Sequence, residues 1–350
     1  MSAPSRRASA INNLPAILNP GVPYSRTVMD TSVFGRHPDG TLYGLSNTTL
    51  NWVTSTDAVT WADSGLTSTT ISGKQEILFD GAGFMYLTTT AGTAWRAPLG
   101  QFDAWTNISV PGLPAGTTGR VGLLVPHAGF LFYGNYNFDA APSPKSGAHI
   151  WRSSDNGTTW AEVMTSAGGR HIHNINPDPL VPTRVWAVVG DSGWPGNGVW
   201  VSEDTGATWR QVVSNRYPID VAFQYGVEGV PDRLVMEGDG PVQPHITDLA
   251  IAQLPGTGQS HPITAAPASF EGTSRGIRIT SEGNLFYIST AEGGATGTKD
   301  AIWLAKGPFF ERPVLLEDLT GNVPAFYGRT YEVGPYLVNW RNRMARPRFN

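Results

Sequence analysis

The chain has 350 residues, among them 41 glycines, 27 prolines and 12 tryptophans, and only 15% of its residues are charged. This composition is typical of many short strands joined by turns and unfavourable for long helices. The absence of cysteine excludes disulfides, thiol nucleophiles and cysteine-ligated metals, and a formal net charge of −4 argues against general nucleic-acid binding. No apolar segment of about 18 residues is present, so we expect no membrane span.

The N-terminal residues 1–22 are rich in Ser, Ala, Asn and Pro and lack a clear periodicity. We expect an arm that is either disordered, donated to close a sheet, or docked to a partner. Arg6 and Arg7 precede an apolar stretch, but Asn12, Asn13 and Pro15 interrupt it. A secretory signal peptide is therefore not expected.

From residue 23 the sequence repeats with a period near 50 residues, and six full units are visible. Each unit begins with a basic residue and an apolar strand, followed by a polar turn and a second strand that in most units contains aromatic residues. Most of the second strands follow a turn signal such as Asp-Gly or Ala-Gly. We expect them at residues 41–45, 84–87, 130–134, 184–189, 233–237 and 284–288.

Pairs of tryptophans mark the third and fourth strands of the first four units: Trp52 and Trp61, Trp95 and Trp105, Trp151 and Trp160, Trp200 and Trp209. Between the last two pairs the chain has the pattern Ser-x-Asp-x-Gly-x-Thr-Trp. In such a turn the aspartate can accept hydrogen bonds from backbone N–H groups two residues on, and the glycine supplies a positive φ. The first pair has Val59 where the glycine should stand, so we expect that turn to be distorted or open.

Four strands per unit in a repeating chain predict an all-β fold, a single β-propeller of four-stranded blades. A seventh start at residues 328–340 has room for about two strands. These either complete a seventh blade together with the N-terminal arm or close a six-bladed ring, and the register of the basic start favours seven. The expected organisation is an arm over 1–22, a propeller over 23–340 and a basic, solvated C-terminal tail over 341–350.

The repeated turn pattern resembles the Asp-box (BNR) repeat of sialidase-like β-propellers. The resemblance implies a structural role, on the face opposite the active site, for Ser153, Asp155, Gly157, Trp160, Ser202, Asp204, Gly206 and Trp209. A cysteine-free single propeller with short arms is also similar to Asp-box propellers among bacteriophage minor tail proteins. That similarity implies a virion tail location, with other tail proteins as partners.

Candidate binding residues gather where the first strand of each blade begins and where the second strand leads to the third. Basic residues in register near these starts would attract an anionic ligand, or would each pair with a carboxylate or carbonyl of the adjacent blade. They are Arg26, Lys74, Arg120, Arg170, Arg216, Arg275 and Arg329. On the loops, Tyr136 and Trp194 suit either stacking on sugar rings or a core or loop-anchoring role, and Asp239 lies on the same expected face.

The most distinctive local run is His171-Ile172-His173, in which both histidines project from one face of a strand, with Asp191 able to approach from the next loop. Two histidines and a carboxylate could bind a metal or share a proton, or be satisfied by water and backbone. We predict no metal and no cofactor. The predicted ligand-binding set is Arg120, Tyr136, Arg170, His171, His173, Asp191, Trp194, Asp239 and Arg275.

Three functions are compatible with this pattern. The first is a non-catalytic virion protein that binds a host-surface glycan or anionic envelope polymer. The second is a sialidase-like or other glycoside hydrolase, but Tyr331 and Glu332 are adjacent and would point to opposite faces of a strand, and no spacing selects a pair of carboxylates. The third is an assembly scaffold that docks through its arms. No catalytic residue is assigned.

Overall fold

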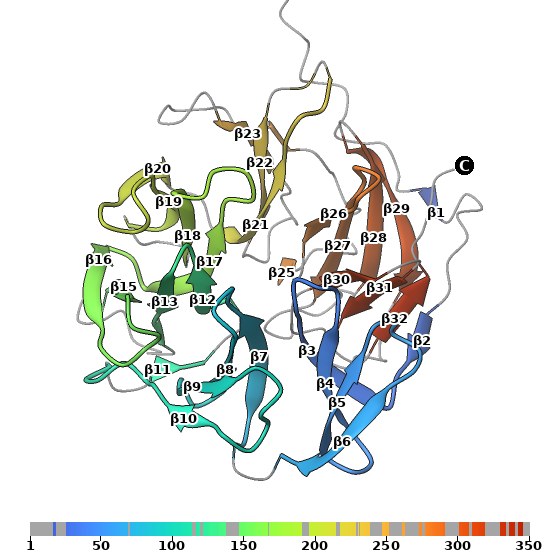
Figure 1. Ribbon diagram of the computed structural model, residues 1–350. Coiled ribbons are helices and arrows are strands. Elements are labelled where there is room, and N and C mark those ends of the chain that lie inside the picture. The colour runs from blue at the N-terminus through green and yellow to red at the C-terminus, as the bar shows by residue number, and fades with distance from the viewer. Residues whose placement is uncertain are drawn as a thin grey trace, which may run out of the picture.

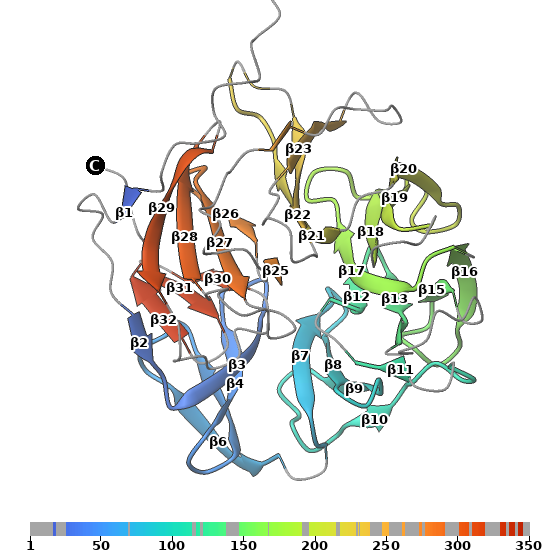
Figure 2. The same cartoon turned by 180° about the vertical axis from the view of Figure 1, so that it is seen from behind.

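The computed structural model describes residues 17–18, 26–68, 71–113, 117–119, 122–137, 147–166, 168–190, 196–214, 218–228, 230, 232–238, 247–251, 261–262, 273–274, 277–290, 301–307, 310–318, 330–333, 336–339 and 342–345. The described strands form sheets arranged radially around one axis (Figures 1 and 2). The predicted all-β fold, a single propeller with four-stranded blades, is confirmed.

The first four sheets follow one another along the chain, each ordered from the inner strand outward and antiparallel throughout. Their strands include the second, third and fourth strands that the sequence predicted. They are β3 (Thr31–Arg36), β4 (Leu42–Ser46), β5 (Asn51–Ser55) and β6 (Ala62–Thr67); β7 (Lys74–Phe79), β8 (Phe84–Thr89), β9 (Ala94–Pro98) and β10 (Thr106–Asn107); β12 (Leu124–His127), β13 (Phe130–Gly134), β15 (Ala148–Ser153) and β16 (Ala161–Ser166); and β17 (His171–Pro177), β18 (Val185–Gly190), β19 (Gly198–Ser202) and β20 (Arg210–Ser214).

The remaining sheets complete the ring, so that the described residues make six four-stranded sheets, one six-stranded sheet and a small ribbon. The next four-stranded sheet contains β21 (Pro218–Gln224), β22 (Arg233–Gly238), β23 (Thr247–Ala250) and β24 (His261–Pro262). The six-stranded sheet contains β25 (Thr273–Ser274), β26 (Arg278–Ile279), β27 (Leu285–Thr290), β28 (Ala301–Lys306), β29 (Glu311–Asp318) and β1 (Ile17–Leu18). The ribbon pairs β11 (Thr117–Thr118) with β14 (Tyr136–Asn137).

Both ends of the chain take part in closing the ring. The last four-stranded sheet contains β30 (Thr330–Val333), β31 (Tyr336–Asn339) and β32 (Asn342–Ala345), and its outermost strand is β2 (Arg26–Val28). β1 runs parallel to β29 on the outside of the preceding sheet. Of residues 1–22 the structure describes β1, and of residues 341–350 it describes β32, and both strands are paired within sheets.

One strand start was assigned to the wrong place in its sheet. The sequence placed Arg26 beside the inner strand of the first blade. In the structure Arg26 belongs to β2 and pairs with Met344 of β32, and the inner strand of the first sheet is β3. The reason is tertiary: ring closure uses the N-terminal strand on the outside of the last sheet, where its hydrogen-bonding partner is β32.

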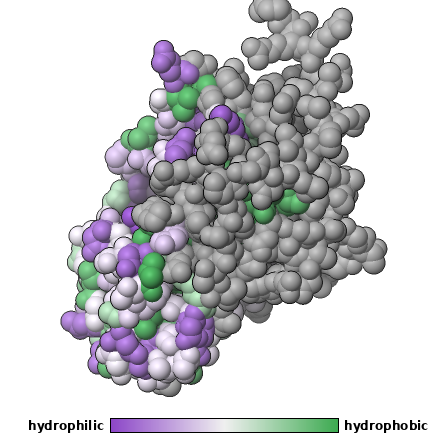
Figure 3. Space-filling model, turned by 90° about the vertical axis from the view of Figure 1, so that its right-hand side faces the viewer, coloured by the Kyte–Doolittle hydropathy of each residue, from purple (hydrophilic) through white to green (hydrophobic). Residues whose placement is uncertain are grey.

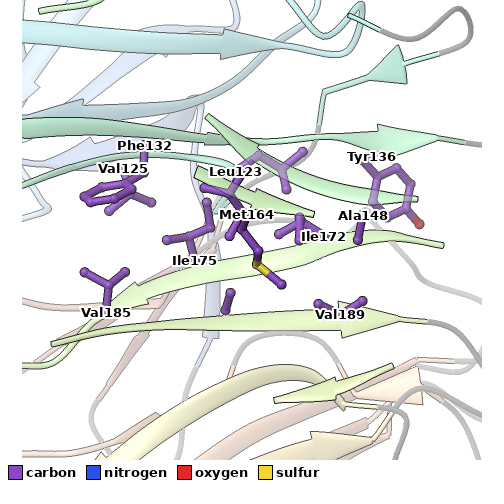
Figure 4. Close-up of a cluster of buried hydrophobic side chains, with 12 residues drawn as sticks. Leu123, Val125, Phe132, Tyr136, Ala148, Met164, Ile172, Ile175, Val185 and Val189 are labelled. Carbon is purple, nitrogen blue, oxygen red and sulfur yellow. The ribbon is translucent and has the colours of Figure 1, made fainter. Parts of the chain in front are cut away.

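The hydrophobic core is divided among the interfaces between neighbouring sheets, because each sheet buries both faces against its neighbours. Figure 4 shows one such interface, where Phe132 and Val125 of one sheet face Ile175 and Val185 of the next. Large aromatic side chains fill these layers, and Trp52, Trp186 and Trp303 are each at most 1% exposed. On the coloured surface of Figure 3, by contrast, hydrophilic and hydrophobic residues alternate in small groups.

The two complete Ser-x-Asp-x-Gly-x-Thr-Trp turns have nearly identical geometry. In the second, the Ser202 hydroxyl donates to Asp204 (2.8 Å) and accepts the Gly206 amide (2.7 Å), while Asp204 also accepts the Thr208 amide (2.8 Å). In the first, the corresponding distances at Ser153 and Asp155 are 2.7, 2.8 and 2.8 Å. The sequence predicted correctly that each aspartate accepts a backbone amide, but that amide lies four residues on, and the amide two residues after each aspartate donates instead to the serine hydroxyl.

Each complete turn also fastens its sheet to the preceding one. Asn156 and Thr205 adopt positive φ (57° and 59°), and their carbonyls accept hydrogen bonds from Arg96 (2.9 Å) and Arg152 (2.7 Å), which lie one sheet earlier. At Gly206, a Cβ would stand 2.3 Å from the ring of Phe132 in that sheet. These turns are contacts between blades as well as hairpin connections.

The first turn is closed, so the expectation that it would be distorted or open is wrong. It is one residue shorter than the complete turns, and Ala58 takes the positive φ (61°). The Ser55 hydroxyl still donates to Asp57 (3.0 Å) and accepts the Ala58 amide (2.9 Å), and Asp57 accepts the Val59 amide (2.7 Å). Removing one residue preserves the turn without glycine, because the carboxylate and hydroxyl still reach the backbone.

Candidate functional site

The predicted site and the repeated turns lie at opposite ends of the same sheet. In the β17–β20 sheet, His171 pairs with Gly190 at one end, and Pro177 with Val185 at the other, where Val185 also pairs with Ser202. The two ends are six residues apart along β17, a distance of roughly 20 Å at about 3.3 Å per residue. We call the end at which the inner strands begin the upper end. The candidate site lies there, and the repeated turns lie at the lower end.

At the upper end, His171 and His173 face each other at the start of β17. Their Nε2 atoms are 2.9 Å apart and each residue is 1% exposed. The register of β17 against β18 shifts between Ile172 and Asn174, so His173 is the bulged residue. A Cβ on Gly190 would stand 2.0 Å from the His173 ring, so glycine at 190 is what admits that ring. The structure brings the two histidines together, as predicted, but in the interior.

Tyr136 joins this pair. Its ring centroid lies 4.0 Å from that of His171 and 5.9 Å from that of His173, and the residue is 9% exposed. The neighbouring Asn135 carbonyl accepts the Ile172 amide at 2.8 Å. For Tyr136 the sequence left open a ring that stacks on a sugar or a core or loop-anchoring role. In the structure the ring contacts His171 at an interplanar angle of 32° and links β14 to β17 beside the upper end.

Of the basic residues at the strand starts, Lys74 has a side chain that binds the protein itself. The Lys74 ammonium donates to the carbonyls of Ser68 (3.2 Å) and Ile71, and lies 5.9 Å from the centre of the Trp52 ring. Burial lowers the pKa of Lys74. Arg170 is half-buried, and its amide donates to the Gly190 carbonyl (3.2 Å). The Ser68 and Ile71 carbonyls both lie on the connection between β6 and β7 that leads to Lys74.

Two carboxylates on inner strands link neighbouring sheets near the axis. Glu76, 1% exposed, accepts the Gly122 amide at 2.7 Å, from the residues that lead into β12. Asp220 on β21 accepts the side-chain amides of Asn174 (2.7 Å) and Asn176 (3.1 Å) from β17. The sequence analysis did not identify this network. The sequence feature that could have revealed this network is a Glu or Asn among the apolar residues of an inner strand.

A second cluster that sequence reasoning missed surrounds Asp178 at the lower end. The Asp178 side chain is fully buried, and it accepts hydrogen bonds from the Tyr225 hydroxyl (2.5 Å), the Trp186 indole (3.1 Å) and the amides of Leu180 and Val181 (2.9 and 3.0 Å). Burial opposes ionisation, but these hydrogen bonds outweigh it and hold the pKa of Asp178 below its ordinary value. The Pro-Asp-Pro turn that carries Asp178 was the visible signal. The cluster holds the β17–β18 turn against β21.

Five of the predicted ligand-binding residues lie outside the described residues: Arg120, Asp191, Trp194, Asp239 and Arg275. Tyr331, which the hydrolase alternative would need as a nucleophile, packs between the first and last sheets with Val333 and Val33, and its hydroxyl lies 3.4 Å from the Phe34 carbonyl. Within the described ranges no group of three or more His, Cys, Asp or Glu is arranged to hold a metal ion. No helix among these residues is long and apolar enough to cross a membrane.

The comparisons with known proteins agree with this architecture. The family model of the DUF6242 beta propeller domain matches residues 34–307, most of the ring. The chain belongs to this family. A search of curated proteins finds no match.

Solved structures of other propellers resemble this DUF6242 propeller in fold. The GH74 xyloglucanase from Xanthomonas campestris is 17% identical with a TM-score of 0.60, over 91% of this chain and 52% of the xyloglucanase, so the chain spans about half of that enzyme. Virginiamycin B lyase from Staphylococcus aureus is 12% identical (TM-score 0.59, 92% and 99% covered). YCF48 bound to D1 peptide is 14% identical (TM-score 0.55, 94% and 96% covered). At these identities the likeness shows the fold alone, and the three proteins have different roles.

Proposed function

We propose that this DUF6242 propeller is a non-catalytic binding module whose upper end recognises a surface glycan or an anionic envelope polymer. The observation that carries the proposal is how the described reactive side chains at that end are used. His171 and His173 are bonded to each other in the interior, and Glu76 accepts a hydrogen bond from the next sheet. Side chains that are hydrogen-bonded within the protein in this way form a rigid support for ligand binding. They leave few described groups at the upper end to act as an acid or a base in catalysis.

The proposal counts each sheet of four or more strands as one blade. On that count we propose a ring of seven blades, with the last blade completed by β2. The Asp-box identity of the repeated turns belongs to the proposal too, and is supported by their serine, aspartate and glycine hydrogen bonds.

The proposed setting is the tail of a bacteriophage virion, where the module would attach to the host surface or contact other tail proteins. This part rests on the similarity of the Asp-box pattern in a cysteine-free single propeller to minor tail proteins. Incorporation into particles is measurable by immunogold labelling of virions, and propeller found only in the soluble fraction of infected cells would contradict it.

The binding test uses purified full-length protein on a glycan array and on bacterial cell walls that carry teichoic acids. We expect binding that Arg170→Ala weakens roughly tenfold or more, because a hydrogen bond or ion pair to a charged ligand group is lost. The matched control is Arg210→Ala, which removes an arginine beside the lower-end turn, where it pairs with Glu203 (3.4 Å). Absence of binding on both supports, or equal losses in the two variants, would overturn the proposal.

The glycoside hydrolase alternative is tested with the same protein. Release of reducing sugar from xyloglucan, or of fluorophore from sialosides and other glycosides, would replace the binding proposal with an enzymatic one. Such turnover would require two carboxyl groups at the upper end. Asp178 cannot supply one of them, because it lies at the lower end, where it accepts a hydrogen bond from Tyr225.

A further inference from the structure

The His171–His173 pair is a buried titratable group that the proposed binding role leaves unused. Histidine is the side chain whose ordinary titration range lies nearest neutral pH. At an Nε2 to Nε2 distance of 2.9 Å, one ring must carry the hydrogen and the other must present its lone pair. The pair can keep this bond with one added proton, provided that one Nε2 stays bare. It cannot keep the bond when both Nε2 atoms carry hydrogen.

The doubly protonated form also places two positive charges about 3 Å apart in a site that is 1% exposed, where like charges repel strongly. The bonded pair therefore holds at most one added proton, whereas separated rings can each hold one, so acidification favours the separated rings. His171 has little room to move, because the Tyr136 ring lies 4.0 Å from its centroid, and His173 is enclosed by the backbone at Gly190. Separation of the two rings therefore displaces Tyr136 or β17.

Tyr136 belongs to the ribbon of β11 and β14, which crosses the upper end beside the start of β17. The ribbon is held to β17 by the Ile172 amide, which donates to the Asn135 carbonyl, and by the contact between the rings of Tyr136 and His171. The described charged and titratable residues on the elements packed against β17, or directly before it, are His127 on β12, Tyr133 on β13, Tyr136 on β14, His149 and Arg152 on β15, Asp220 on β21, and Arg170. Arg170 opposes a second positive charge near the pair, whereas Asp220 favours it.

We propose that the pair is a proton-controlled latch, in which mild acidification breaks the His171–His173 bond and loosens the β11–β14 ribbon from β17. The inference rests on the proposed function in one respect only: release of the ribbon at the upper end would change ligand binding there. The latch itself requires no ligand to be observed.

Hydrogen exchange followed by mass spectrometry tests the latch on the full chain at pH 7.5 and pH 5.0, after correction for intrinsic exchange rates. We expect segments covering Ile172 and the β11–β14 ribbon to exchange roughly fivefold faster, or more, at pH 5.0, the effect of losing about one hydrogen bond. Segments covering β8 and β9 should be unchanged. Equal protection of the ribbon at both pH values would overturn the proposal.

His173→Gln replaces one ring with an amide that cannot be protonated in this range, so the pH dependence of ribbon exchange should disappear. The matched control is His37→Gln, at the lower end, where His37 lies 3.0 Å from Asp39; it should retain the full pH dependence. If circular dichroism shows that His173→Gln does not fold, His171→Gln replaces it. A variant that keeps the wild-type pH dependence contradicts the latch. Ligand binding at pH 7.5 is scored separately, so failure of the binding proposal leaves this result intact.

Discussion

The two complete turns, Ser153–Trp160 and Ser202–Trp209, differ from the shorter turn Ser55–Trp61 in how they pack against the preceding sheet. All three use a serine hydroxyl and an aspartate to bind the backbone of the turn. The complete turns place a glycine against the preceding sheet, whereas the shorter turn buries the methyl group of Ala58 in a cluster with Val333 of the preceding sheet. The hydrogen bonds are thus the common requirement, and the glycine is required only where the turn has its full length.

The largest expected effect comes from filling the space at a complete turn. In Gly206→Ala, the added methyl group would meet the buried Phe132 ring at 2.3 Å while φ stays at +79°. Backbone strain and overpacking together should lower the free energy of unfolding by roughly 3 kcal/mol. Urea denaturation at neutral pH measures this loss.

Gly83→Ala is the matched control, because Gly83 also has a positive φ (+88°) but nothing lies within 4 Å of the added methyl group. Only backbone strain remains there, about 1–2 kcal/mol. Equal losses in the two variants would mean that the contact between the complete turn and the preceding sheet contributes nothing.

A smaller effect should be common to the complete and the shorter turns, and it depends on pH. Hydrogen bonds from the Thr159 hydroxyl and amide lower the pKa of Asp155 to about 2, and the amides of Thr60 and Val59 do the same for Asp57. Because these pKa values lie below that of an unfolded aspartate, the stabilisation is complete above about pH 4 and is lost as the pH falls toward 2.

Asp155→Asn and Asp57→Asn should each reduce the fall in Tm between pH 4 and pH 2, which thermal unfolding followed by circular dichroism measures. Asp103→Asn, on the exposed β9–β10 turn, is the control and should keep the wild-type slope. If only the Asp155 variant changes the slope, the two kinds of turn differ in their hydrogen bonds as well as in their length.

The smallest effect is expected at the position that replaces glycine in the shorter turn. Ala58→Gly relieves the strain of φ +61° but removes a fully buried methyl group and adds freedom to the unfolded chain. These terms nearly cancel, so we expect a change of less than about 1 kcal/mol in urea denaturation. A loss as large as that of Gly206→Ala would show that the methyl group is the principal contact between the first and last sheets.

The sequence by itself determined the features that local chemistry controls. Apolar strands, most of which follow turn signals, predicted β4, β8, β13, β18, β22 and β27 where they occur. The Ser-x-Asp-x-Gly pattern predicted that Asp155 and Asp204 bind backbone amides and that Gly157 and Gly206 take positive φ, because these features depend on residues within one turn. The alternation of His171 and His173 predicted that they share a face, although a bulge rather than a regular strand brings them together.

Only the tertiary structure decided which groups meet across sheets. Arg26 lies on an outer strand because closure of the ring joins β2 to β32, more than 300 residues away in sequence. The histidines are interior and bound to each other because Tyr136 from another sheet covers them. Asp178 and Asp220 are anchors between sheets because their partners come from the neighbouring inner strands or the turns that follow them. Such contacts depend on how radially packed sheets face one another, a relation that the residue spacing within one repeat does not contain.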